Sequence, residues 1–180
     1  MSVFLGWLPD AATQAALADL RLRVEAALPA GAPRHDWRRP AQWHMTLRYL
    51  GECIDEAQRA RVASALAGCA TTIAPADAAI SSAQYWPHAR VLVAKIDASP
   101  ALKALLKQLE AEAQGSGFGK ERAQTAHITL AYLPRGATPP VIAGIDANVR
   151  LRIDKIDLLR TVPGSYDTLA SWPLTGRCGA

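Results

Sequence analysis

A four-residue pattern, His-x-Thr-Leu, occurs twice in this chain, and it constrains the fold more than any other feature. The two copies occupy residues 44–47 and 127–130. The similarity continues beyond them, because an alignment of residues 44–50 with 127–133 matches five of seven positions. The copies lie 83 residues apart in a chain of 180, one in each half. This spacing predicts a duplicated architecture in which two equivalent elements face each other.

The residues of each copy are expected to form a β-strand. Side chains alternate between the two faces of a strand. We therefore expect His44, Thr46 and Arg48 to share one face. By the same count, His127 and Thr129 share the equivalent face of the second strand. Each face would then carry a histidine and a threonine two residues apart, with apolar residues behind them.

Paired histidines and threonines suit acid–base chemistry at a phosphate. An imidazole has an ordinary pKa near 6.5, so one ring can accept a proton while the other donates one. A threonine hydroxyl can donate a hydrogen bond to a phosphate oxygen. One histidine in a strand is usually a surface or core residue, but the repeat favours catalysis. A zinc site is not expected, because neither copy has a third ligand of suitable type nearby.

Composition limits the class of protein. Half of the residues are hydrophobic and a fifth are charged, which is typical of one globular domain that could have two lobes. The apolar stretch Val3–Leu8 is interrupted by Gly6 and followed by Pro9, so it is too short for a signal peptide or a membrane span. We expect a cytoplasmic protein without a membrane. The three cysteines form no CxxC pair, so no disulfide framework is expected.

The charge balance leaves two interpretations open. The formal net charge is +4, and the sequence contains fifteen arginines against five lysines. Arginine is well suited to phosphate oxygens, so nucleic acid is a candidate partner. An ordinary basic surface would give the same composition.

The secondary-structure pattern predicts an α+β fold with mostly antiparallel sheet. The expected strands are residues 3–8, 43–50, 79–85, 90–96, 126–133, 148–159 (as one or two strands) and 169–174. The expected helices begin after Asp10, Asp55 and Ser99, and end near Leu28, Cys69 and Gln114.

The two motifs and their flanks resemble the two-histidine (2H) phosphoesterase superfamily, within it the bacterial RNA 2′,3′-cyclic phosphodiesterases, also called 2′-5′ RNA ligases. The resemblance rests on residues 43–51 (WHMTLRYLG), on residues 126–131 (AHITLA) with Arg122 upstream, and on the opening segment VFLGWLP at residues 3–9. The tail is also similar, with GSY at residues 164–166 and WPL at residues 172–174.

The resemblance implies a bilobal, pseudo-symmetric fold: residues 1–180 form one domain with two mostly antiparallel sheets, outer helices and a central groove. His44 and His127 line that groove. The implied reaction opens a terminal 2′,3′-cyclic phosphate to a 2′-phosphate, with His127 as base and His44 as acid. Thr46, Thr129 and Tyr166 are implied to bind substrate. No metal or cofactor is implied, and we expect a monomer.

Alternative activities remain open at this stage. Relatives can also join RNA ends through a 2′-5′ linkage, which is the reverse reaction with an RNA hydroxyl as nucleophile. The same chemistry could act on a cyclic nucleotide or on ADP-ribose cyclic phosphate. A third possibility is an RNA-end binder without turnover.

Two positions depart from the family pattern. Ala126 stands where the family usually has proline, and Tyr132 stands where it usually has a basic residue aimed at the phosphate. The position of Arg48 on the predicted His44 face makes it our first candidate for the missing charge. Arg122 and Arg135 are the alternatives.

Overall fold

A computed structural model describes residues 1–122, 125–137, 140 and 144–176 of the chain. Its strands are β1 (Ser2–Trp7), β2 (Asp36–Trp37), β3 (Met45–Glu52), β4 (Ala76–Trp86), β5 (Val91–Asp97), β6 (His127–Tyr132), β7 (Ile145–Ile153), β8 (Lys155–Val162) and β9 (Ser165–Pro173). Its helices are α1 (Ala11–Ala27), α2 (Glu56–Cys69) and α3 (Pro100–Gly115), with short 3₁₀ turns η1 (Pro40–Gln42) and η2 (Ala70–Thr72). The α+β class is confirmed.

Each α-helix begins at the residue that the sequence predicts. The side chain of Asp10 accepts a hydrogen bond from the Thr13 amide at 2.8 Å. Asp55 caps α2 in the same way, and Ser99 caps α3 with Pro100 in the first turn. These caps satisfy backbone N–H groups that have no partner within the helix.

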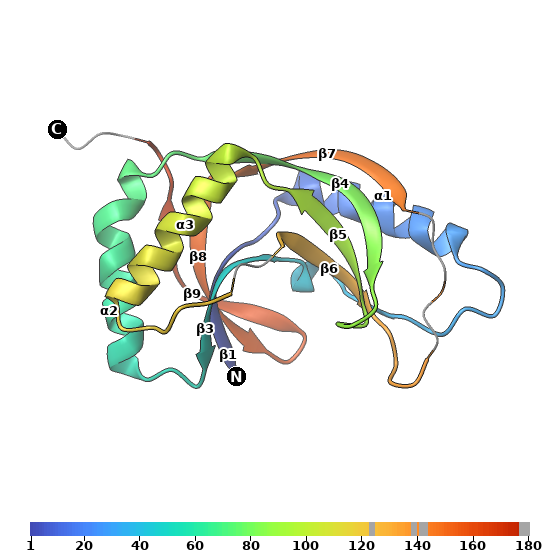
Figure 1. Ribbon diagram of the computed structural model, residues 1–180, viewed down its shortest axis with the longest axis horizontal. Coiled ribbons are helices and arrows are strands. Elements are labelled where there is room, and N and C mark those ends of the chain that lie inside the picture. The colour runs from blue at the N-terminus through green and yellow to red at the C-terminus, as the bar shows by residue number, and fades with distance from the viewer. Residues whose placement is uncertain (123–124, 138–139, 141–143, 177–180) are drawn as a thin grey trace.

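The strands form one curved antiparallel sheet in the order β7-β4-β5-β6-β3-β1-β8-β9, and β2 pairs with β6 beside this path (Figure 1). The two mostly antiparallel sheets that the family resemblance implies are thus continuous with each other. The junction is narrow, because β3 and β6 share a single residue pair, Met45 with Ile128. The four strands on each side of this junction correspond to the two predicted lobes.

The helices cover the two halves differently. α1 contacts β7, α3 contacts β3 and β4, and α2 contacts α3 and β9. Figure 1 shows α2 and α3 at the left end of the molecule and α1 towards the right. The largest fully buried side chains come from both halves, among them Trp43, Leu5, Leu17, Met45, Ile128 and Leu130. Among the described helices, none combines the length and the apolar composition that a membrane span requires.

Strand β3 contains a bulge inside the first motif. Thr46 lies opposite Gly6, but the next paired residue is Arg48, opposite Leu5. Leu47 is therefore an extra residue, and the register shifts there. A bulge of this kind interrupts the alternation of side chains along a strand.

Strand β6 has a bulge at the equivalent place in the second motif. Thr129 lies opposite Val93, and the next paired residue is Ala131, opposite Leu92. Leu130 is the extra residue, as Leu47 is in β3. The duplication therefore extends from the sequence to the irregularities of the backbone.

The bulges reverse the predicted faces of the residues that follow them. Gly6 and Leu5 are neighbours on β1, so their side-chain directions differ, and Arg48 lies on the opposite face from Thr46. By the same reasoning, Tyr132 lies on the face of Thr129, because its partner Val91 shares a face with Val93. We call the face that carries Thr46 and Thr129 the histidine face.

Candidate active site

The two motifs meet at the centre of the sheet. Met45 and Ile128, which follow the two histidines, are direct antiparallel partners. Continuing that register by one residue places His44 across from Thr129 and His127 across from Thr46. The motifs are thus related by a pseudo-twofold axis through this pair, and each histidine faces the other motif's threonine. Both threonines are partly exposed.

Both imidazoles are held in the same way by the backbone. Nδ1 of His44 lies 3.2 Å from the carbonyl oxygen of Gln42, and Nδ1 of His127 lies 2.8 Å from that of Thr125. A carbonyl only accepts hydrogen bonds, so Nδ1 carries the proton in each ring. Nε2 is then the nitrogen that exchanges a proton with a substrate, and both rings are oriented for that task.

His44 lies in an aromatic enclosure. Its ring centroid is 5.0 Å from that of Phe4 and 4.6 Å from that of Tyr166. The Tyr166 hydroxyl donates to the same Gln42 carbonyl at 3.4 Å, so Tyr166 supports the orientation of His44. The pKa of His44 is lowered to about 4, mainly by burial and also by the charges of His127 and Arg38, against the opposing effect of the Gln42 carbonyl. Burial also raises the pKa of Tyr166 to about 12.

His127 has a different environment. Its ring centroid lies 4.7 Å from that of Trp86, which ends β4 in the same half of the sheet. Lys95 is its direct cross-strand partner on β5, so the ammonium group of Lys95 and the imidazole project from the same face. The two rings are therefore equivalent in backbone placement but not in surroundings.

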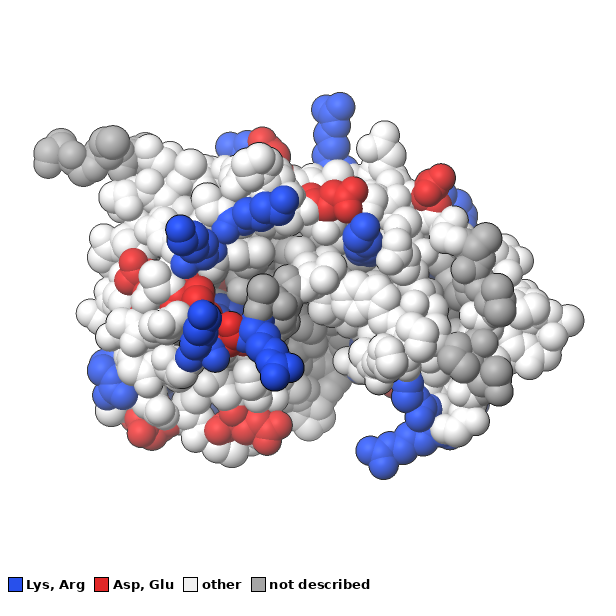
Figure 2. All heavy atoms as spheres, in the orientation of Figure 1, with Lys and Arg blue, Asp and Glu red and all other residues white. Residues whose placement is uncertain are grey.

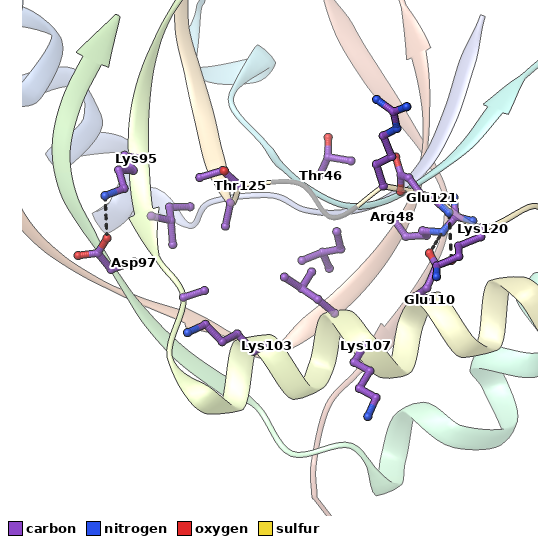
Figure 3. Close-up of a pocket in the computed structure, with 16 residues that line it drawn as sticks. Thr46, Arg48, Lys95, Asp97, Lys103, Lys107, Glu110, Lys120, Glu121 and Thr125 are labelled. Atoms are coloured by element: carbon purple, nitrogen blue, oxygen red, sulfur yellow. Dashed lines mark hydrogen bonds and ion pairs between the residues drawn. The ribbon is translucent and has the colours of Figure 1, made fainter. Parts of the chain in front are cut away.

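The structure contradicts the predicted position of Arg48. Its side chain is buried on the face opposite Thr46, with Nε 2.5 Å from a carboxylate oxygen of Glu110 and Nη1 3.4 Å from one of Glu121. It also donates to the carbonyl oxygens of Tyr49 and Gly119. In Figure 3, Arg48 extends towards Glu110 of α3, whereas Thr46 points away from it. The physical reason for the error is the bulge at Leu47, which the alternation count did not include.

Arg122 lies at the rim of a pocket of about 820 Å³. Among the described residues, no contact joins it to either histidine. This pocket extends from Thr46 and Thr125 towards α3, and its rim carries Lys103, Lys107 and Lys120 (Figure 3). Figure 2 shows lysine and arginine side chains gathered over α3 and the hollow beside it. Arg135 is exposed in a turn after β6.

Arg38 is a cation near the site that the two motifs do not include. It follows β2, and its amide donates to the carbonyl oxygen of Leu130 at 2.7 Å. Its guanidinium carbon lies 5.1 Å from the ring centroid of Tyr132. The basic segment around residue 38 was a signal, but the contact with a residue 94 positions later depends on the tertiary structure.

A family model described as the 2′-5′ RNA ligase superfamily matches residues 9–164. The chain belongs to the 2′-5′ RNA ligase superfamily. The resemblance to 2H phosphoesterases that the two motifs indicated is thereby confirmed. No curated protein matches the sequence closely enough to add a specific activity.

Several solved structures share the fold. TT0787 of Thermus thermophilus matches with a TM-score of 0.79 and 23% identity, covering 99% of this chain and 100% of that one. E. coli LigT complexed with NADP+ matches with a TM-score of 0.72 and 23% identity, covering 97% of each chain. The PDE domain of MHV ns2 matches with a TM-score of 0.57 and 13% identity, covering 84% of this chain and 97% of that one.

Proposed function

We propose that this superfamily member is an RNA 2′,3′-cyclic phosphodiesterase that opens terminal cyclic phosphates to 2′-phosphates, with the 2′-5′ joining reaction as its reverse. The observation that carries the proposal is the pair of imidazoles with matched Nδ1 anchors on a pseudo-twofold axis. A phosphate between them can receive a nucleophile on one side and release a leaving group on the other. Phosphodiester cleavage needs these two proton transfers.

The reaction balances with these groups alone. One neutral imidazole removes a proton from water as the water oxygen attacks phosphorus. The bond from phosphorus to the 3′ oxygen breaks, and the second imidazole, which is protonated, gives its proton to that oxygen. Hydroxyl groups of Thr46 and Thr129 donate to the non-bridging oxygens, where negative charge accumulates. The 2′-phosphate remains.

The surroundings of the histidines favour His44 as base and His127 as acid. Burial among Phe4 and Tyr166 keeps the His44 imidazole neutral over most of the working pH range, as a base requires. His127 lies outside this aromatic enclosure, against Trp86, and is the other imidazole of the pair. This assignment is the reverse of the order implied by the family resemblance.

The pH profile should report the burial of His44. The acid limb of kcat/KM is expected near pH 4 rather than near 6.5, because kcat/KM follows the free protein and the pKa of His44 is lowered to about 4. Activity at pH 5 should therefore stay close to its maximum. Rates measured from pH 3.5 to 9, with an NMR titration of the His44 ring, check this. An acid limb at pH 6 or above would contradict the assigned environment.

The basic rim favours an oligonucleotide over a free cyclic nucleotide. Lys103, Lys107, Lys120 and Arg122 make no ion pair within the part of the chain that the structure describes. The acidic residues at the same rim are already engaged, since Glu110 and Glu121 bind Arg48 and Asp97 binds Lys95. The unpaired cations can therefore bind backbone phosphates of a strand whose end lies at the histidines.

Replacing Lys103 and Lys107 together by alanine should lower kcat/KM about tenfold for an oligoribonucleotide but leave a mononucleotide 2′,3′-cyclic phosphate unaffected. Two fewer phosphate contacts should also reduce the slope of log(kcat/KM) against log[salt] by about 1.4. The matched control is Arg150→Ala with Arg152→Ala on the edge strand β7. Equal losses on both substrates would favour the small-nucleotide alternative.

The activity itself is tested with a labelled oligoribonucleotide that ends in a 2′,3′-cyclic phosphate, in the presence of EDTA. The expected product is the 2′-phosphate isomer, identified by comparison with both synthetic isomers. Binding of the labelled end without any product would support the alternative of an RNA-end binder. Turnover that appears only after addition of a divalent metal would exclude the two-histidine mechanism.

A further inference from the structure

A phosphate at the two histidines needs more positive charge than the threonines provide. Cleavage passes through a state in which negative charge builds on the non-bridging oxygens, and hydroxyl groups carry only dipoles. Arg48 is unavailable, because Glu110 and Glu121 hold it on the opposite face. The cation must therefore come from another side chain on the histidine face.

Strand pairing brings Arg38 to that face. Asp36 of β2 lies opposite Tyr132 of β6, so the two side chains share a face, and Arg38 follows Asp36 by two residues. The bulge at Leu130 turns Tyr132 to the face of Thr129. The Arg38 amide is fixed by its hydrogen bond to the Leu130 carbonyl. Backbone contacts thus place Arg38 beside the second motif, although it comes from the first half of the chain.

The side chain of Arg38 is oriented by Tyr132, and its ion pair with Asp36 is long and exposed. Its guanidinium lies over the Tyr132 ring at 5.1 Å, within the range of a cation–π contact. Its nearest carboxylate, on the exposed Asp36, is 3.8 Å away, and its Nε is buried without a hydrogen-bond partner among the described residues. The positive charge of Arg38 also acts to lower the pKa of both His44 and Tyr166. An arginine whose charge acts on His44, and whose guanidinium lies over a residue of the second motif's strand, is suited to bind a phosphate.

We propose that Arg38 binds the non-bridging phosphate oxygens during the reaction and that Tyr132 is a positioning residue, whose ring holds the guanidinium over the histidine face. The proposal rests on the proposed phosphodiesterase function. Tyr132 therefore acts indirectly, because its ring holds the guanidinium of Arg38, which lies 94 residues earlier in the chain.

The test compares kcat/KM of Arg38→Ala, Tyr132→Phe and Tyr132→Ala on the cyclic-phosphate oligonucleotide. Arg38→Ala should lower kcat/KM by about 10²-fold, in the range for loss of one charge-stabilising donor. Tyr132→Phe keeps the ring and should stay within about twofold of wild type, whereas Tyr132→Ala should lose about fivefold. The control is Arg39→Ala, which removes an adjacent, exposed arginine and should have little effect.

A compensating variant separates a direct role from a structural one. Tyr132→Arg combined with Arg38→Ala returns a guanidinium to the same face, so it should regain at least about tenfold over Arg38→Ala alone. The NMR-measured pKa of His44 should rise in Arg38→Ala, because Arg38 and His127 are the charges that lower it, with Tyr166 as the other titratable neighbour. A merely structural arginine would give neither result.

Binding of inorganic phosphate, measured by titration calorimetry, distinguishes the two hypotheses. Wild type could lack turnover while Arg38→Ala still weakens phosphate binding about tenfold. The proposed phosphodiesterase activity would then be wrong, but the binding of phosphate by Arg38 would be supported. Wild type could instead be active while kcat/KM of Arg38→Ala stays within threefold of the wild-type value. The proposed role of Arg38 would then be wrong, but the phosphodiesterase activity would be supported. Failure of the double variant to gain over Arg38→Ala would also overturn the proposed placement.

Discussion

His44→Ala and His127→Ala are each expected to lower kcat/KM for a cyclic-phosphate end by about 10²–10⁴-fold, the usual contribution of one general acid or base. The double variant should be little worse than the poorer single variant, because the two residues act in one proton-transfer sequence. Initial rates on the labelled oligonucleotide measure both effects.

The control for this experiment is His88→Ala, which removes an exposed histidine in the turn between β4 and β5 and should leave the rate unchanged. Because His44 packs between Phe4 and Tyr166, circular dichroism and thermal unfolding must accompany its replacement. A folded single variant with near-normal turnover would exclude the two-histidine mechanism.

Arg48→Ala should affect stability rather than chemistry. The substitution leaves Glu110 and Glu121 without their shared cation, and breaking a buried ion pair in this way costs about 3–5 kcal/mol. We expect the free energy of unfolding to fall by about 3 kcal/mol, near the lower limit, because both carboxylates keep some exposure. Urea unfolding measures the loss.

The matched control is Arg59→Ala, whose ion pair with Glu56 is exposed and should contribute less than about 1 kcal/mol. At a temperature where the variant is fully folded, Arg48→Ala should keep kcat/KM within about threefold of wild type. If the stability is unchanged and kcat/KM falls by about 10²-fold, Arg48 binds the phosphate as the sequence first suggested.

Local sequence signals predicted most of the elements. Asp10, Asp55 and Ser99 begin the helices in the structure as they do in the sequence pattern. The first strand, expected at residues 3–8, is found at Ser2–Trp7. The two-residue strand β2 was not predicted, because it forms only through its pairing with β6. His35, which precedes β2, is 7% exposed and stacks on Trp37.

The site was harder to predict beyond the two histidines. A bulge arises from how two strands pair, so the sequence of β3 alone gives no reason to interrupt the alternation at Leu47. That single interruption moves Arg48 away from the histidine face, and its equivalent at Leu130 brings Tyr132 onto it. The position of Arg38 then depends on the pairing of β2 with β6, two segments that are far apart in the sequence. Motifs located the acid–base pair, whereas the surrounding charges required the tertiary structure.

The most direct test of the mechanism uses a cyclic-phosphate oligonucleotide in which sulfur replaces the departing 3′ oxygen. A thiolate is a far weaker base than an alkoxide and leaves without a proton, so this substrate needs no general acid. We expect His127→Ala to recover to within about tenfold of wild type on the sulfur substrate, while His44→Ala stays as impaired as on the oxygen substrate. Recovery of His44→Ala instead, or of neither variant, would contradict the proposed mechanism.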